Sequence, residues 1–370
     1  MPSKQYFVKL EKLINSLEQC EAEELLQRMC DIIDLSKAES DTDTTAEFAK
    51  HLIQASNHFG RFDYEMRAFG EMRLLYKQYE RLSDLRHDVI WYYKWIAERV
   101  PEHVEVPKQK VFELLDQMEE FYKQEEAGLR PVHTMRFRAA SFMGLKEEAE
   151  FYFKKWENES EDETDDCPAC TAHGVVQYLL EQGQVEKAIE VAKPILEGTL
   201  FCDEVPAITA SRLLLPLWAA DRTEEALTYS LMVRRQVRKV PKLLAYLADH
   251  VVFLTAVGAL NLAARNNYVM LAKSDGMSNS ADLFSIYRAA WIYFSVQGKF
   301  ETGPVAISDR CELGRLGNLM PVKEAAAWCE QKTRDIARQF DERNGTGRFM
   351  ERLQMAERIA LLNPEDEAGG

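Results

Sequence analysis

The sequence predicts an all-α fold, a right-handed α-solenoid of about seven degenerate helical hairpins, and three observations point to it. First, glycine (17) and proline (12) are scarce among the 370 residues, which leaves too few turn signals for an all-β fold. Second, hydrophobic residues make up 46% and charged residues 29%, as in a folded protein with a buried core. Third, apolar helical runs recur along the chain, and a turn signal follows each at a nearly constant interval.

The turn signals share one form, in which a residue that tolerates left-handed backbone stands five residues before a small residue. These turn residues are Gly144, Gly183, Asp221, Gly258 and Gly298, and neighbouring ones are 37 to 40 residues apart. Each is expected to end one helix and to lead into an antiparallel second helix. Because a hairpin cannot bury its own apolar face, neighbouring hairpins have to stack. The units resemble tetratricopeptide (TPR) repeats but exceed their usual length of about 34 residues, so we expect degenerate TPR-like hairpins.

The N-terminal third carries the same pattern less regularly. Gly60 marks an earlier turn, two units of 42 residues before the first of the five. The turn between these two units is expected where Pro101 and Pro107 break the helices. A first helix pair is expected over residues 3–35. An irregular helical bundle is the alternative to a repeat array.

The chain is expected to divide into three parts. Residues 1–130 hold degenerate N-terminal hairpins, residues 131–340 hold the clearer repeats with a cysteine-rich site between two of them, and residues 341–370 form a C-terminal capping helix and tail. The last boundary rests on the pair Asn344-Gly345, a strong left-handed helix end, after which an apolar run starts a final helix.

Three cysteines far apart in the sequence are expected to converge. Cys167 and Cys170 precede the first helix of one unit, and Cys202 precedes the first helix of the next. Equivalent positions in stacked units lie about 10 Å apart, roughly one helix diameter. Structural zinc takes four tetrahedral ligands, and His173 shares a helix face with Cys170. The sequence therefore predicts a structural Zn²⁺ joining two repeats, with Asp165, Asp166 and Asp203 as oxygen alternatives to His173 as the fourth ligand.

Two other interpretations of these cysteines remain open, namely free thiols and a redox pair. The motif "CPAC" at a helix start is similar to a thioredoxin-type motif, but no alternating strands and helices surround it. Seven acidic residues lie within residues 157–166. In the absence of a metal their field would raise the cysteine pKa values, which argues against a reactive thiol of low pKa.

The motifs together resemble a group of bacterial TPR-containing proteins to which no activity is assigned. Members carry a CxxC before a helix, a third cysteine about thirty residues later and an "FDxRNG" motif near the C-terminus. Here the cysteine positions fall on Cys167, Cys170 and Cys202. The tail motif falls on Phe340, Asp341, Arg343, Asn344 and Gly345. The resemblance covers roughly residues 130–350 and implies an α-solenoid without enzymatic activity.

The net charge of −15 and the absence of long apolar runs restrict the partners. Phosphate backbones would be repelled by the average field, so we expect no nucleic-acid partner. No window of the sequence approaches the length of a membrane span, so we expect no membrane partner. The N-terminal segment has no apolar run of the kind that signal peptides have, and we therefore expect a cytoplasmic protein.

The first helices of the hairpins are expected to line a concave face, where polar side chains are the default ligand contacts. The candidate residues for binding a peptide or protein partner are Arg136, Arg138, Gln177, Arg212, Asp249, His250, Tyr287 and Arg288. No catalytic motif occurs in the sequence. We therefore expect a non-enzymatic scaffold that binds a protein or peptide. The alternatives are a peptide-sensing regulator and a CxxC thiol redox protein.

Overall fold

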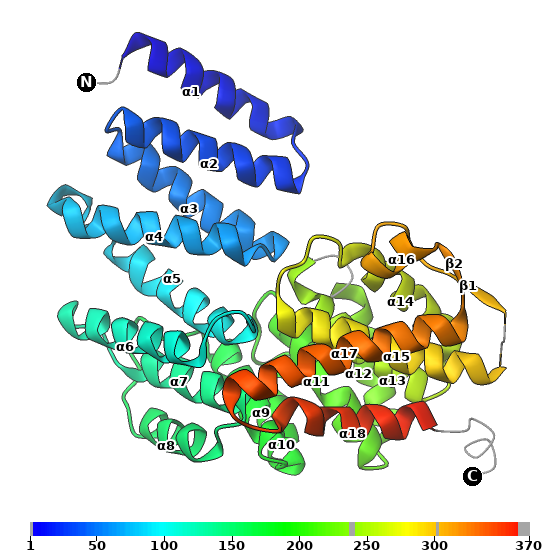
Figure 1. Ribbon diagram of the computed structural model, residues 1–370. Coiled ribbons are helices and arrows are strands. Elements are labelled where there is room, and N and C mark those ends of the chain that lie inside the picture. Colours follow the sequence, from blue (N-terminus) through cyan, green and yellow to red (C-terminus); the bar gives the residue numbers. More distant parts are fainter. Residues whose placement is uncertain (1–2, 237–240, 301–302, 362–370) are drawn as a thin grey trace.

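The computed structural model describes residues 3–236, 241–300 and 303–361, and this part of the chain is almost entirely helical (Figure 1). It contains eighteen α-helices, and its strands are limited to one antiparallel pair. The all-α class predicted from the sequence is therefore confirmed. The predicted C-terminal tail, residues 362–370, lies outside the described residues.

The N-terminal helices follow one another in space in chain order, as the blue and cyan part of Figure 1 shows. They are α1 (Lys4–Ser16), α2 (Ala22–Ala38), α3 (Thr42–Phe59), α4 (Phe62–Gln78), α5 (Leu85–Arg99) and α6 (Lys108–Gln124). Gly60 ends α3 with a φ of 71°, as its place in the pattern predicted. The turn expected between the two prolines consists of a single 3₁₀ turn (Val100–Glu102) and extended residues that lead to α6.

The middle of the chain forms four hairpins at the predicted turns. Their helices are α7 (Arg130–Met143), α8 (Lys146–Glu157), α9 (Pro168–Glu181), α10 (Val185–Leu196), α11 (Val205–Ala219), α12 (Thr223–Gln236), α13 (Leu244–Ala256) and α14 (Leu260–Lys273). The turn residues Gly144, Gly183, Asp221 and Gly258 all have φ between 58° and 78°. The fifth predicted turn is wrong, because Gly298 lies inside α15 (Ser280–Phe300).

The small residue after each turn is buried where two helices of a hairpin meet. Ala149, Ala188, Ala226 and Ala263 each have 0% exposed surface. A larger side chain there would push the second helix away from the first. The first helices of consecutive hairpins also pack on one another, in the order α5, α7, α9, α11, α13 and α15. Polar side chains on these six helices are thereby brought to one side of the molecule.

The C-terminal segment does not extend the row but returns over it. After α15 come β1 (Pro304–Ala306), α16 (Glu312–Leu316), β2 (Leu319–Pro321), α17 (Val322–Asn344) and α18 (Arg348–Leu361). Helix α17 packs along α15 and reaches α7, and α18 packs on both α15 and α17. The orange and red helices of Figure 1 therefore cross the middle of the molecule rather than cap its end.

The segment that links α17 to α18 fixes the position of these two helices over the row. We call residues 340–352 the C-terminal clasp. The guanidinium group of Arg343 donates hydrogen bonds to the carbonyl oxygens of Pro101 and His103, both at 2.8 Å, and of Val106 at 3.4 Å. Lys108 Nζ in turn donates to the Asn344 carbonyl oxygen at 3.0 Å. Residues some 240 positions apart are thus joined by charge-assisted hydrogen bonds.

Other residues of the FDxRNG motif shape the clasp itself. Gly345 ends α17 with a φ of 72°, as the sequence predicted. Asp341 accepts hydrogen bonds from the backbone N–H groups of Phe349 and Met350, which satisfies free donors in the first turn of α18. The Phe340 ring stacks on the Phe349 ring with centroids 4.2 Å apart. The motif thus accounts for a helix end, a helix start and the packing between them.

The buried apolar side chains form two clusters that meet at α7. One cluster runs from Tyr6 to Met143, and the other runs from Phe137 to Ile359. Helix α7 contributes to both, so the predicted boundary at residue 130 falls at the start of the shared helix. Among the helices of the described residues, none combines the length and the apolar character needed to cross a membrane.

Candidate metal cluster and binding cavity

The three predicted cysteines do converge. Cys167 is the N-cap of α9, Cys170 lies in its first turn, and Cys202 lies in the connection from α10 to α11. Their Sγ atoms all lie within 4.8 Å of one another. All three are free thiols, and Cys167 is exposed whereas the other two are half-buried. The stacking of two hairpins therefore brings together two thiols at the start of α9 and one thiol in the connection between α10 and α11.

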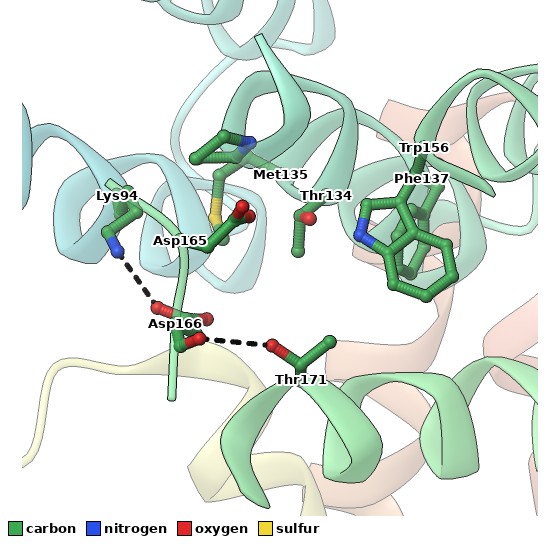
Figure 2. A pocket seen from close by; sticks show the side chains of 9 residues that line it. Lys94, Thr134, Met135, Phe137, Trp156, Asp165, Asp166 and Thr171 are labelled. Atoms are coloured by element: carbon green, nitrogen blue, oxygen red, sulfur yellow. Dashed lines mark hydrogen bonds and ion pairs between the residues drawn. The ribbon is translucent and has the colours of Figure 1, made fainter. Parts of the chain in front are cut away.

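The acidic segment before Cys167 is held by structural contacts. Lys94 is buried in α5, and its Nζ atom donates to the Thr164 carbonyl oxygen at 2.7 Å and to Asp166 Oδ1 at 2.9 Å. Figure 2 shows Lys94 and Thr171 on either side of Asp166, where Thr171 Oγ1 donates to the Asp166 carbonyl oxygen. The space enclosed there is about 10 Å³, which is too small for a ligand. This contact fixes the backbone just before Cys167.

The predicted alternatives for a fourth metal ligand point elsewhere. His173 is buried, and its Nδ1 atom shares a 2.9 Å hydrogen bond with Thr209 Oγ1 on α11. Asp165 pairs with Arg130 at 3.5 Å, and Asp166 pairs with Lys94. Among the described residues, the only His, Cys, Asp or Glu side chains that form a metal-sized group are the three cysteines. The structure therefore does not bring His173 into the group of the three cysteines.

The thiols differ in pKa. Burial raises the pKa of Cys167, but hydrogen bonds from the Cys170 backbone N–H and from the other two thiols outweigh burial, and the net pKa of Cys167 is lowered. Burial raises the pKa of both Cys170 and Cys202, and contact with Cys167 adds to the rise. The pKa of Cys167 is therefore lowered and not raised, because backbone N–H groups in the first turn of α9 donate hydrogen bonds to its sulfur.

The geometry of the cluster fits a zinc-sized ion. A tetrahedral site with Zn–S bonds of about 2.3 Å places its sulfur atoms about 3.8 Å apart, so a contraction of at most about 1 Å would close the site. Three soft thiolates are the donor set that zinc prefers. The exposed side of Cys167 leaves a fourth position accessible to water.

A second feature is a cavity of about 340 Å³ beneath the C-terminal clasp. Five of the eight predicted partner-binding residues line it, one from each of five first helices: Arg138 on α7, Gln177 on α9, Arg212 on α11, Asp249 on α13 and Arg288 on α15. Its apolar wall includes Phe142, Tyr246, Phe284 and Phe349. Cavities of this size and mixed lining are typical of small-molecule sites.

The other three predicted residues have structural partners outside the cavity. Arg136 pairs with Asp116 at 2.7 Å and Glu119 at 2.9 Å on α6. His250 is buried, and its Nε2 atom shares a 2.7 Å hydrogen bond with Ser230 Oγ on α12. The Tyr287 hydroxyl donates to Glu312 at 3.2 Å on α16. These side chains connect helices within the array.

One end of the cavity carries an excess of positive charge. Arg212 Nη1 and Arg288 Nη2 donate to the two oxygens of Asp249, at 2.7 Å and 3.0 Å. The α18 residues Arg348 and Arg352 both pair with Glu181. We call the four guanidinium groups of Arg212, Arg288, Arg348 and Arg352 the basic end. Together with the carboxylates of Asp249 and Glu181, this end of the cavity carries four positive and two negative charges.

Burial and neighbouring positive charges disfavour the protonated form of three arginines at the basic end. Burial and the charge of the nearby Arg212 together lower the pKa of Arg352 to about 10. Burial and then the charge of Arg352 lower the pKa of Arg348 to about 10. Burial also lowers the pKa of Arg288, whose Nε atom has no hydrogen-bond partner among the described residues. An anion placed among these groups would relieve all three effects.

The other end of the cavity, the acidic end, is formed by Glu98, Glu102 and Asp282. Glu98 accepts a hydrogen bond from Arg138 at 2.8 Å, and Glu102 accepts one from Asn279 at 2.7 Å. Burial and the neighbouring Asp282 raise the pKa of Glu102 to about 7. Burial raises the pKa of Asp282 to about 6. The charge of Arg99 acts in the opposite direction and lowers the pKa of both Glu102 and Asp282, but it does not outweigh burial.

Sequence reasoning missed the residues that the clasp and the α5–α6 connection bring to the cavity. Arg348, Phe349 and Arg352 come from α18, and Glu102 comes from the 3₁₀ turn after α5. The only signal for the α18 residues was the arginine spacing of four, which places Arg348 and Arg352 on one helix face.

Comparison with known proteins leaves the chain without an assigned family. No family model matches it, and no curated protein matches it either.

Proposed function

We propose that this protein is a non-enzymatic binding protein: a right-handed, TPR-like α-solenoid whose concave side receives a peptide or a segment of a protein. The observation that carries the proposal is the cavity itself, in which charged side chains from the six consecutive first helices α5, α7, α9, α11, α13 and α15 converge on one space. Such convergence from separate repeats is the usual way in which helical arrays form a ligand site. A purely structural role would leave the cluster of like charges at the basic end without a cause.

The C-terminal clasp restricts what can bind. Because α18 supplies Arg348, Phe349 and Arg352 to the cavity wall, the concave side is a bounded site rather than an open groove. A bound peptide would therefore place one or a few residues in the cavity. Of the two alternatives that the sequence leaves open, a peptide-sensing protein would use the same kind of site, whereas a redox protein would not need it.

Peptide binding can be tested by selection from a synthetic pool. We expect the wild-type protein to retain a defined subset from a pool of peptides of two to twelve residues, identified by mass spectrometry. Arg288→Gln should retain at least about tenfold less, the loss expected for one charge-assisted contact. Arg338→Gln, at an exposed position of α17, is the matched control and should retain as much as the wild type. Equal retention by all three proteins, or none by the wild type, would refute the proposal.

The cysteine cluster is proposed to hold a structural Zn²⁺ that ties the start of α9 to the connection before α11. The support is the donor set of three thiols and their mutual distances of at most 4.8 Å. Zinc would keep the thiols deprotonated and would add a direct link between two hairpins that also meet through helix packing and the His173–Thr209 hydrogen bond. Water or an outside ligand would take the fourth position.

The zinc proposal predicts a loss of metal in Cys202→Ser. We expect one zinc ion per chain in the purified wild type by elemental analysis and a small fraction of that in the variant. Where free zinc exceeds its Kd about 1,000-fold, its removal should cost about 4 kcal/mol of stability. Hydrogen exchange should rise in residues 158–170 and 197–204. Cys20→Ser, far from the cluster, is the control.

A zinc-free wild-type protein would contradict this assignment. If Cys167 and Cys170 instead formed a disulfide reversibly near the potentials of thioredoxins, the redox alternative would replace it.

A further inference from the structure

We infer that the cavity binds a free peptide of two or three residues, with its amino group at the acidic end and its carboxylate at the basic end. This inference rests on the proposed function and narrows it from a peptide or protein segment to a short zwitterion. The argument uses the distribution of charge, the distance between the two ends and the size of the space.

The charges that line the cavity sum to zero, but the excess positive charge and the excess negative charge lie at different ends. Arg138 is matched by Glu98, and four arginines of the basic end face two carboxylates. This leaves two cations in excess at that end. Glu102 and Asp282 are the two anions left over in the lining. Arg99, behind the lining, lowers the pKa of both, but its ion pair is with Glu65 at 3.6 Å. A ligand with one charge of each sign, suitably spaced, would compensate both ends at once.

Helix α15 gives the distance between the ends. Asp282 lies in its first turn and Arg288 lies six residues later, which corresponds to about 9 Å along the helix axis. An extended peptide spans at most about 3.5 Å per residue, so two or three residues cover that distance. The two charges of a single amino acid are too close together to reach both ends.

The volume agrees with this length. The space of about 340 Å³ lies at the lower limit of small-molecule pockets, about 300–1,000 Å³. On the α18 side the wall is closed, because the side chain of Phe349 is fully buried against Phe340. The aromatic and aliphatic lining between the two ends suits apolar side chains.

The inference is tested by calorimetric titration of the full chain with dileucine and trileucine, each compared with its N-acetylated and its C-amidated form. We expect at least one free form to bind, and either block to weaken binding by about 10- to 100-fold, as for the loss of one charge-assisted hydrogen-bonding group. Equal affinity for free and blocked forms, or for acetate and the free peptides, would overturn the inference. So would the absence of binding by both free peptides.

Two variants test the acidic end and the basic end of the cavity separately. In Glu102→Gln the free peptide should bind no better than the N-acetylated one, while the preference for a free carboxylate should remain. In Arg288→Gln the preference for the carboxylate should fall and the preference for the amine should remain. Arg338→Gln should keep both preferences, and thermal melts check that each variant is folded. Unchanged preferences in folded Glu102→Gln and Arg288→Gln would overturn the placement.

The results also distinguish a failure of this inference from a failure of the proposed function. If the synthetic pool yields longer or end-blocked peptides while free dipeptides and tripeptides do not bind, the inference fails and the binding function stands. If the pool yields nothing and the free peptides do not bind, both fail.

Discussion

Replacing Arg343 by alanine is expected to lower the free energy of unfolding by about 3–5 kcal/mol. The guanidinium group donates to the carbonyl oxygens of Pro101, His103 and Val106, and it is the contact that joins α17 to the α5–α6 connection. Alanine would leave these acceptors without their charged donor, and each buried acceptor left unpaired costs about 1–3 kcal/mol. Denaturant unfolding followed by circular dichroism measures the change.

The matched control for this prediction is Arg338→Ala on the same helix. Arg338 is exposed, and within the described part of the chain its only ion pair is with Asp335 three residues before it. Its loss should therefore cost less than about 0.5 kcal/mol. Lysine at position 343 should recover part of the stability at most, because an ammonium group lacks the planar fork of donors. Hydrogen exchange should rise at residues 100–107 in the alanine variant. Equal stability of the two alanine variants would show that the clasp contact is unimportant.

Phe349→Ala is expected to cost about 3–5 kcal/mol, the usual range for a fully buried phenylalanine. The Phe349 ring has 0% exposed surface. It contacts the rings of Phe340, Phe284 and Phe142 with centroids 4.2, 5.2 and 5.3 Å away. Removing it would leave a void where α18, α17, α15 and α7 meet, and the same void would open into the cavity. Thermal and denaturant unfolding measure the loss.

Met350→Ala is the control for the neighbouring position, since Met350 is exposed and should cost less than about 0.5 kcal/mol. Phe349→Leu should retain more of the stability than alanine because it fills more of the space. If Phe349→Ala melted like Met350→Ala, then α18 would be a detachable cap, as the sequence first indicated, and not part of the cavity wall.

The hairpin turns were predictable because their cause is local. Left-handed backbone is favoured by glycine and tolerated by aspartate, and Gly144, Gly183, Asp221 and Gly258 all adopt it. Gly298 has the same sequence context, but α15 continues through it because the helix packs along α17 and α13. Tertiary packing can thus override a turn signal that is right elsewhere.

Helix geometry explains which groove residues were misplaced. Residues two apart on a helix point about 200° away from each other, so Arg136 and Arg138 could not both face the concave side. The structure places Arg138 at the cavity and turns Arg136 toward α6. The neighbouring pairs at 249–250 and 287–288 are divided in the same way. Choosing the correct member of each pair requires knowing where the next helix lies.

The convergence of the cysteines followed from the repeat pattern, but the identity of a fourth ligand did not. His173 lies three residues after Cys170, yet it is one turn deeper in α9, where it contacts Thr209 rather than the thiols. The return of α17 and α18 was also not predictable. It depends on Arg343 meeting carbonyl groups about 240 residues earlier, and no local pattern encodes such a partner.

The clasp has a consequence for the order in which the protein matures during synthesis. Chains leave the ribosome N-terminus first at about 5–20 residues per second, and helical hairpins can form as soon as they emerge. The walls contributed by α7 to α15 would therefore exist well before Arg348 and Arg352 have been translated. The cavity wall is complete only after this last step, so a nascent chain stalled before residue 348 would carry a nearly complete but open array.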